Sequence, residues 1–163
     1  MVKVIKMAKG IQQWLDEYGE SHQNKLNKRI HWFCVPQIFW TVMAAIYVIP
    51  TPAILLELSP HLNWATIMIV AVVLYYATLS VSLTIGMAVF SAACYSLIIM
   101  FESAFPGNLL MFAAIYFIAL WALQFYGHEV EGKKPSFLKD IQYLMIGPAW
   151  LMSFIYKKIG LKY

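Results

Sequence analysis

The chain has 163 residues, of which 61% are hydrophobic, 16% aromatic and only 12% charged. Ordinary soluble domains are about 45–50% apolar, so this composition excludes a soluble domain and indicates a membrane protein in contact with membrane lipid. The net charge of +4 does not indicate a nucleic-acid partner, because the Lys and Arg residues lie beside the ends of apolar blocks, where they contact lipid head groups.

The N-terminal segment, residues 1–18, has apolar residues at helical spacing, with lysines and acidic residues on its other faces. This pattern predicts an amphipathic helix that lies on the membrane surface. A polar stretch follows, and then a first predicted span at about residues 30–49, with Pro36 in its first turns. Proline is tolerated in a membrane helix where neighbouring groups satisfy the freed carbonyl.

The middle of the chain has no charged residue from Trp64 to Met100, which is too long for one crossing. We therefore predict a helical hairpin with spans at about 64–79 and 82–101 and a turn near 78–82. After a short loop, a fourth apolar run predicts a span at about 108–126.

The last apolar run, 143–156, has only 14 residues and contains a Gly-Pro pair. A run of this length is typical of a re-entrant or interfacial segment, so we expect residues 137–156 to lie at the interface. The predicted fold is a single all-α integral membrane domain, residues 1–163, with four transmembrane helices. Nothing in the sequence indicates an oligomeric state.

The basic residues fall in three places, 3–29, 133–139 and 157–162, and the two loops between them have none. Four spans put all three places on one side of the membrane, which by the positive-inside tendency is the cytoplasmic side. The membrane would be a bacterial inner membrane or that of the endoplasmic reticulum. His22, His31 and His128 then share the cytoplasmic surface with Glu131, and His61 lies on the opposite side.

A shared metal site requires a bend between His22 and His31. On one continuous helix these residues would lie on opposite faces and about 13 Å apart along the axis. Asn27 is a favoured residue for the start of a helix, so we predict that it begins the first span and lets the chain bend.

Near the end of the fourth span, we predict that Gly127 interrupts or ends the helix. His128 and Glu131, three residues apart, then share one helical face. Imidazoles with a carboxylate suit non-haem iron and also zinc.

Other interpretations remain open from the residues alone. Histidine is common at membrane interfaces, where one end of a side chain is wet. His31 and His128 as axial ligands would suit a haem- or quinone-binding electron-transfer bundle, and a non-catalytic small membrane protein is a further alternative. A transporter is disfavoured, because no charged residue lies in the middle of a span.

Two motifs carry a resemblance to a known family. His22-x4-Asn27-x3-His31 with Pro36 precedes the first apolar run, and Gln124-Phe-x-Gly-His128-x-x-Glu131-x-x-x-Pro135 follows the fourth. The pair resembles the membrane-bound fungal 2-hydroxy-fatty-acid dioxygenases of phytosphingosine breakdown and their bacterial relatives. Cys34 is a departure, since family members often have a small residue such as glycine there.

The resemblance implies an iron(II)-dependent enzyme of fatty acid α-oxidation, which uses O₂ to convert a long-chain 2-hydroxy fatty acid to the acid one carbon shorter. By position it implies His22, His31 and His128 as Fe²⁺ ligands, with Glu131 as a fourth ligand or as a support for the others.

We expect three further residues, Asn27, Lys133 and Lys134, to contact the substrate, because hydrogen-bond donors and cations steady a carboxylate. Each lysine is also explained as an ordinary positive-inside residue. We expect Trp121 and Tyr126 to border the path of the acyl tail, although both also suit an aromatic belt at the membrane surface.

Overall fold

The structure is a computed structural model that describes residues 9–136 and 142–163, and these residues form seven helices and no strand. The helices are α1 (Ile11–Gly19), α2 (Lys25–Tyr47), α3 (Ala53–Leu58), α4 (Trp64–Ala77), α5 (Val81–Ala104), α6 (Leu109–Glu131) and α7 (Tyr143–Ile159). The all-α prediction is confirmed.

Three of these helices, α2, α5 and α6, are long and apolar enough to cross a membrane, with 23, 24 and 23 residues. The chain is therefore a membrane protein, as predicted. The helix α4 is apolar but has only 14 residues, a length of about 21 Å at 1.5 Å per residue, so the count of four spans remains a prediction. The turn predicted near 78–82 is present, because α4 ends at Ala77 and α5 begins at Val81.

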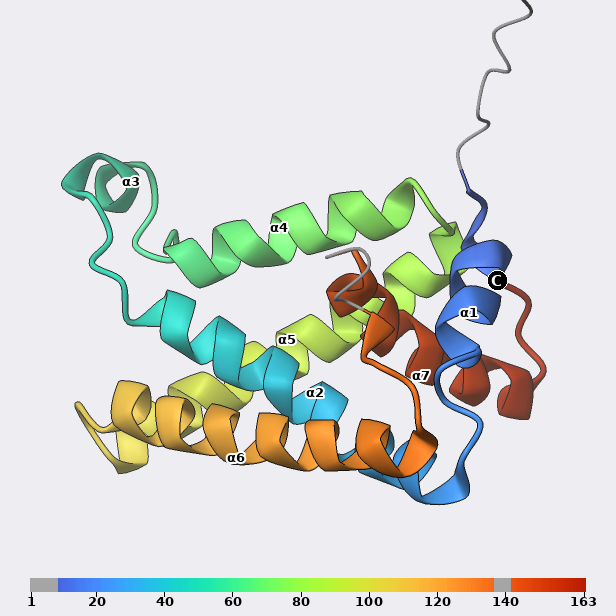
Figure 1. Cartoon of the computed structure of the whole chain (residues 1–163). Coiled ribbons are helices and arrows are strands. Elements are labelled where there is room, and N and C mark those ends of the chain that lie inside the picture. Colours follow the sequence, from blue (N-terminus) through green and yellow to red (C-terminus); the bar gives the residue numbers. More distant parts are fainter. Residues whose placement is uncertain (1–8, 137–141) are drawn as a thin grey trace, which may run out of the picture.

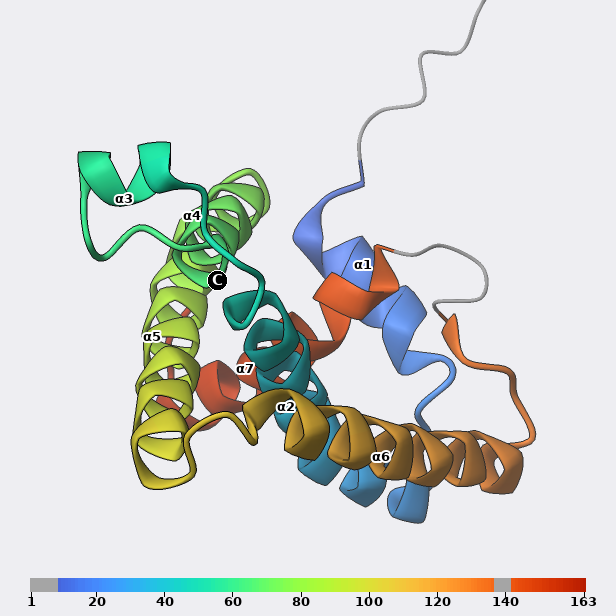
Figure 2. The same ribbon diagram turned by 90° about the vertical axis from the view of Figure 1, so that its left-hand side faces the viewer.

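The helices are arranged around two antiparallel pairs, α2 with α6 and α4 with α5 (Figures 1 and 2). The helix α7 packs against α1, α2 and α5. Figure 1 shows α1 and α7 at the end of the bundle where α2 begins and α6 ends, and α3 at the opposite end. Segments from the first and last thirds of the chain therefore meet at one end.

Tyrosine hydroxyl groups tie α7 to its neighbours. The Tyr156 hydroxyl donates to the Ser82 carbonyl oxygen at 2.6 Å, and the Tyr143 hydroxyl donates to a Glu17 carboxylate oxygen at 2.5 Å. Tyr76 of α4 donates to the carbonyl of Met145. These bonds join α7 to α1, α4 and α5, so α7 is a fixed wall of the bundle.

The first span begins earlier than predicted, and the residue that caps it differs. Asn24, not Asn27, is the N-cap of α2, since its side chain accepts from the backbone N–H groups of Leu26 at 2.8 Å and Asn27 at 3.5 Å. Asn27 is fully buried inside the first turn. The predicted bend between the two histidines exists, three residues before its predicted place, and Pro36 consequently lies in the middle of the helix.

The prediction that Gly127 interrupts or ends the fourth span is wrong. The helix α6 continues through this residue to Glu131 and ends at Gly132, whose φ of 71° lies in the left-handed region that favours glycine. Gly127 has another role, because a Cβ atom there would lie 2.5 Å from Asn27 Oδ1. It allows α2 and α6 to approach closely.

The two predicted interfacial segments are described in part. In α1 the apolar Trp14, Leu15 and Tyr18 are buried while Gln12 and Asp16 are exposed, as expected of an amphipathic helix. The helix α7 runs three residues beyond the predicted end at 156. Residues 1–8 and 137–141, which belong to the two predictions, lie outside the described residues. The helix α3, in the loop between the first two predicted spans, was not predicted.

Candidate metal centre

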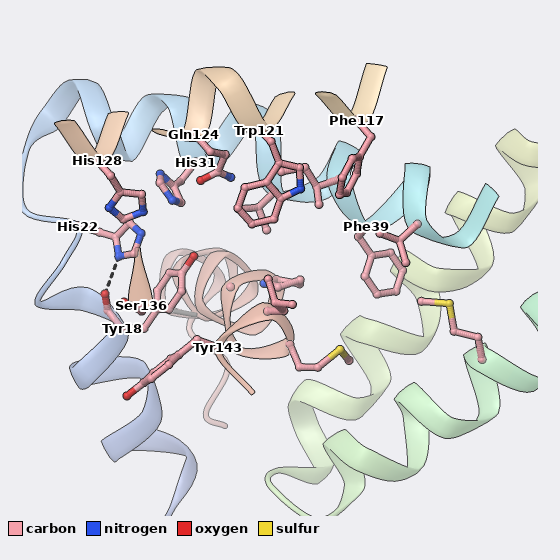
Figure 3. Close-up of a pocket in the computed structure, with 18 residues that line it drawn as sticks. Tyr18, His22, His31, Phe39, Phe117, Trp121, Gln124, His128, Ser136 and Tyr143 are labelled. Carbon is pink, nitrogen blue, oxygen red and sulfur yellow. Dashed lines mark hydrogen bonds between the residues drawn. The ribbon is translucent and has the colours of Figure 1, made fainter. Parts of the chain in front are cut away.

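Three histidines from three segments meet at one end of the bundle. His22 precedes α2, His31 lies in its second turn, and His128 lies in the last turn of α6. All three are buried, and one ring nitrogen from each lies within 4.8 Å of one from each of the others. The ring centroids are 4.2 to 5.1 Å apart, and each pair of rings is nearly perpendicular. The convergence predicted from sequence is therefore present (Figure 3).

Backbone carbonyl oxygens fix the orientation of two of these imidazoles. His22 Nδ1 lies 2.5 Å from the Tyr18 carbonyl oxygen, and His31 Nδ1 lies 3.0 Å from that of Asn27. A carbonyl oxygen only accepts, so each Nδ1 carries the proton and each Nε2 keeps its lone pair. Metal-binding histidines usually donate their second N–H in this way.

The ring nitrogens left over fit a metal ion. Among the described residues, His22 Nε2 and His128 Nδ1 are buried and have no hydrogen-bond partner. A buried polar atom without a partner costs about 1–3 kcal/mol, so a bound cation would satisfy an otherwise unfavourable arrangement. A cluster of three imidazoles suits iron(II) or zinc.

The surroundings of His22 keep its imidazole neutral. Burial lowers the pKa of His22 to about 4, against a weaker opposing effect of its hydrogen bond to the Tyr18 carbonyl. The Tyr18 ring stacks on the His22 ring with centroids 4.1 Å apart, and Trp150 of α7 lies 5.3 Å away. At neutral pH the ring is therefore in the form that binds metal.

Glu131 supports the polypeptide around the histidines and is not part of the group of three. One carboxylate oxygen accepts from the Gln23 N–H at 2.8 Å. The other accepts from the Asn24 N–H at 2.8 Å and from Asn27 Nδ2 at 3.0 Å. These bonds hold the bend that contains His22 against the end of α6.

The predicted substrate residue Asn27 lies inside this network. Its Nδ2 also donates to the Ser21 carbonyl oxygen at 3.1 Å, so the side chain links the bend to Glu131.

A cavity of about 260 Å³ opens from the three histidines into the bundle. Its walls are mostly apolar, and in Figure 3 the histidines are at one end while Phe39 and Phe117 are at the other. Besides the histidines, the hydroxyl- and amide-bearing residues that line it are Tyr18, Gln124, Ser136 and Tyr143. The cavity is therefore polar at the metal centre and apolar beyond it. The full lining consists of Tyr18, His22, His31, Val35, Ile38, Phe39, Val42, Met68, Phe117, Trp121, Gln124, His128, Ser136, Tyr143, Leu144, Met145, Gly147 and Pro148.

Comparison with known families matches residues 8–159 to the family described as 2-hydroxy-palmitic acid dioxygenase Mpo1-like. The match covers nearly the whole chain and both histidine motifs. The chain belongs to this family. Comparisons with curated proteins and with solved structures gave no significant match. The family name indicates a dioxygenase that acts on a 2-hydroxy fatty acid, which agrees with the resemblance seen in the motifs.

Two other predicted substrate residues lie outside the cavity of this family member. Lys133 and Lys134 are exposed, and they border a shallow surface pocket that also includes His128. Lys133 Nζ donates to the Glu20 carbonyl oxygen at 2.7 Å. His61 is exposed in the loop between α3 and α4, at the end of the bundle away from the three histidines. Trp121 lines the cavity as predicted, whereas Tyr126 is exposed and does not.

The contributions of Tyr18, Gln124 and α7 to the site were not predicted from the sequence. Gln124 is the one amide inside the uncharged run 109–125, and a buried polar residue in a span is a signal of function. The part played by α7 has no local signal, because its contacts with α1 and α2 join residues far apart in the chain.

The geometry does not favour the haem interpretation. A porphyrin would have to fit between its two axial imidazoles, whereas the ring centroids of His31 and His128, the axial ligands in that interpretation, are only 5.0 Å apart.

Proposed function

We propose that this protein is an iron(II)-dependent dioxygenase of fatty acid α-oxidation, which converts a long-chain 2-hydroxy fatty acid to the acid one carbon shorter. The observation that carries the proposal is the position of three buried imidazoles at the end of an apolar cavity, two of which, His22 and His128, have a ring nitrogen without a hydrogen-bond partner. Family membership supports the substrate class. Three imidazoles suit iron(II) and zinc alike, so the assignment of iron rests on the dioxygenase named by the family, because oxidation by O₂ requires a redox-active metal.

His22, His31 and His128 are the proposed ligands, and a bound iron(II) would supply the redox chemistry that O₂ requires. In this proposal Glu131 holds the bend around His22 and does not bind the ion, because its oxygens already accept three hydrogen bonds. Three protein ligands leave room for substrate and O₂.

The side chains beside the histidines suit the polar end of the substrate. The Tyr18 hydroxyl points into the cavity in Figure 3, and Gln124 lies beside His31. Burial raises the pKa of Tyr18, so its hydroxyl keeps the proton that it can donate to a carboxylate or hydroxyl oxygen. We propose that Tyr18 and Gln124 orient the bound 2-hydroxy acid inside the cavity. Lys133 and Lys134, on the protein surface beside His128, would attract the negatively charged substrate to this end of the bundle before it binds.

The oxidation balances without a further reductant. The bond between C1 and C2 breaks, and C2 becomes the carbon of the new carboxyl group. If C1 leaves as carbon dioxide, the two carbons lose four electrons in total, which one O₂ accepts, and water is the remaining product. The apolar walls of the cavity exclude bulk water from this step.

We also propose that the metal centre faces the cytoplasm. The support is the distribution of the basic residues, because α2 begins and α6 ends at the same end of the bundle and both termini carry lysines. Short loops at the opposite end lack Lys and Arg, which agrees with the positive-inside tendency.

The reaction is tested by incubating the detergent-solubilised protein with iron(II), air and 2-hydroxypalmitate, followed by chromatography of the acids. We expect pentadecanoate, and we expect much less product from palmitate, which lacks the 2-hydroxyl group that helps to orient the substrate. The His61→Ala variant is the matched control and should keep its activity. Absence of pentadecanoate, or equal formation by the His128→Ala variant, would contradict the proposal.

A further inference from the structure

The length of the cavity is defined by two facing helices. On α2 the lining residues run from His31 to Val42, and on α6 from His128 to Phe117. Each stretch covers 11 positions along an antiparallel pair, which is about 16 Å at 1.5 Å per residue. The hydrocarbon core of a bilayer is about 30 Å thick, so one leaflet accounts for about 15 Å. The cavity is therefore about as long as the acyl chain of a lipid in one leaflet.

The lining residues between these limits form one stripe on each helix. On α2, Val35, Ile38 and Phe39 lie between the two ends, and on α6, Trp121 and Gln124 do. The spacings of three and four residues bring all of them to one helix face. Both stripes border one cavity that α7 also lines, while α2 and α6 pack against each other through other residues, among them Cys34 and Leu120. A mostly apolar path therefore leads away from the histidines.

We infer that Val42 of α2, Phe117 of α6 and Met68 of α4 form the end of this path and select the length of the acyl chain. The inference rests on the proposed function and adds which residues choose among 2-hydroxy fatty acids. Val42 and Phe117 are the lining residues farthest along their helices from His31 and His128, and Met68 is the one lining residue from α4. The head group is held at the metal centre, so the far end of the cavity limits how many methylene groups fit.

The energy of burial sets the size of the expected effect. Each methylene moved from water into an apolar site contributes about 0.8 kcal/mol, or roughly a fourfold change in binding. A chain that is too long must bend or displace side chains, which opposes this gain. The preference should therefore peak at one length and fall on both sides of it.

The test is the profile of kcat/KM for saturated 2-hydroxy acids of even length from decanoic to eicosanoic. Phe117→Ala removes a ring from the end of the path and should move the peak to a longer acid by two or more carbons. Val42→Phe fills the same region and should move it to a shorter acid. The longest and shortest acids should change by about tenfold in opposite directions, since two methylenes are worth roughly sixteenfold at most.

Matched control variants lie outside the cavity. Ile118 is next to Phe117 and 68% exposed, and Val89 of α5 is 66% exposed. Ile118→Ala and Val89→Phe make the same kinds of change on surfaces away from the cavity, so their profiles should match that of the unaltered protein.

Iron content is measured for each variant, so that a lost metal centre is distinguished from a changed preference. Where a variant loses iron, the milder Phe117→Leu or Val42→Leu replaces it. Profiles that stay fixed in variants with intact iron content, or that shift equally in the controls, would overturn the inference. If the unaltered protein shortens none of the acids, the proposed function itself is wrong.

Discussion

At the scale of single residues, the decisive feature is that two of the three imidazoles are oriented before any ion binds. Backbone carbonyl oxygens hold His22 and His31, and Tyr18 stacks on the first of them. An imidazole that is already oriented loses little conformational freedom when it binds a metal. The site therefore depends on groups that are not ligands themselves.

The role of Glu131 can be separated from that of the histidines by two substitutions. Glu131→Gln keeps one accepting oxygen, which can still accept from Asn24 and Asn27 while the bond from the Gln23 N–H is lost, so iron content should fall less than in Glu131→Ala. Glu131→Ala removes all three hydrogen bonds at this carboxylate and should weaken iron binding by about 10- to 100-fold, as for other groups that support a ligand.

Iron titration of the purified variants, followed by mass spectrometry of bound metal, measures this difference. If Glu131→Gln loses iron as completely as a histidine variant does, Glu131 is a ligand and the assignment as a support is wrong.

At the scale of helices, the close contact between α2 and α6 brings His31 and His128 together. A Cβ atom at Gly127 would lie 2.5 Å from Asn27 Oδ1 and 3.2 Å from Ile30 Cδ1. Contacts this short require the helices to separate or Asn27 to move, and such crowding costs about 1–3 kcal/mol. A glycine within a membrane helix has this use wherever backbones pack closely.

We therefore expect Gly127→Ala to lower the midpoint of thermal unfolding in detergent by several degrees and to weaken iron binding. Gly10→Ala is the matched control, since nothing lies within 4 Å of the added Cβ and its φ is −70°. Circular dichroism during heating measures the unfolding midpoint of both variants, and iron titration measures their iron binding. An unchanged midpoint for Gly127→Ala would show that α2 and α6 do not pack as the structure describes.

The sequence predicted the helices better than it predicted their ends. Hydropathy indicated the runs that became α2, α4, α5 and α6, because burial in lipid requires long apolar segments. The cap was misplaced by three residues, since Asn24 and Asn27 are equally suitable and only the position of Glu131, more than 100 residues away, decides between them. Spacing does not reveal such a contact.

The candidate site was predictable where chemistry is local and not where it depends on packing. The three histidines stand out in an apolar chain, and a bend between His22 and His31 was required for them to meet. The cavity was not predictable, because its walls combine faces of α2, α6 and α7 whose pairing is set by the whole bundle.

At the scale of the whole molecule, the two ends of the bundle differ in charge and in chemistry. The end with α1 and α7 has His22, His31 and His128, and the segments rich in lysine lie there too. The loops at the opposite end have no Lys or Arg. This asymmetry predicts that both termini lie in the cytoplasm.

Single cysteines test the orientation in intact cells with a thiol reagent that does not cross membranes. Lys162→Cys should stay unlabelled, and Glu57→Cys in α3 should be labelled. The native Cys34 and Cys94 are buried, with exposed fractions of 0% and 4%, so the background should be low. Labelling of the cysteine at 162 but not of that at 57 would reverse the proposed topology.

The most direct test of the account is the iron(II) content of the purified protein and of its single histidine variants. The unaltered chain and His61→Ala should each bind one iron(II), whereas His22→Ala, His31→Ala and His128→Ala should each lose most of it, because a missing ligand leaves the ion incompletely bound in a buried site. Retention of iron by any of these three variants, with the fold intact by circular dichroism, would contradict the proposed metal centre, as would equal loss from His61→Ala.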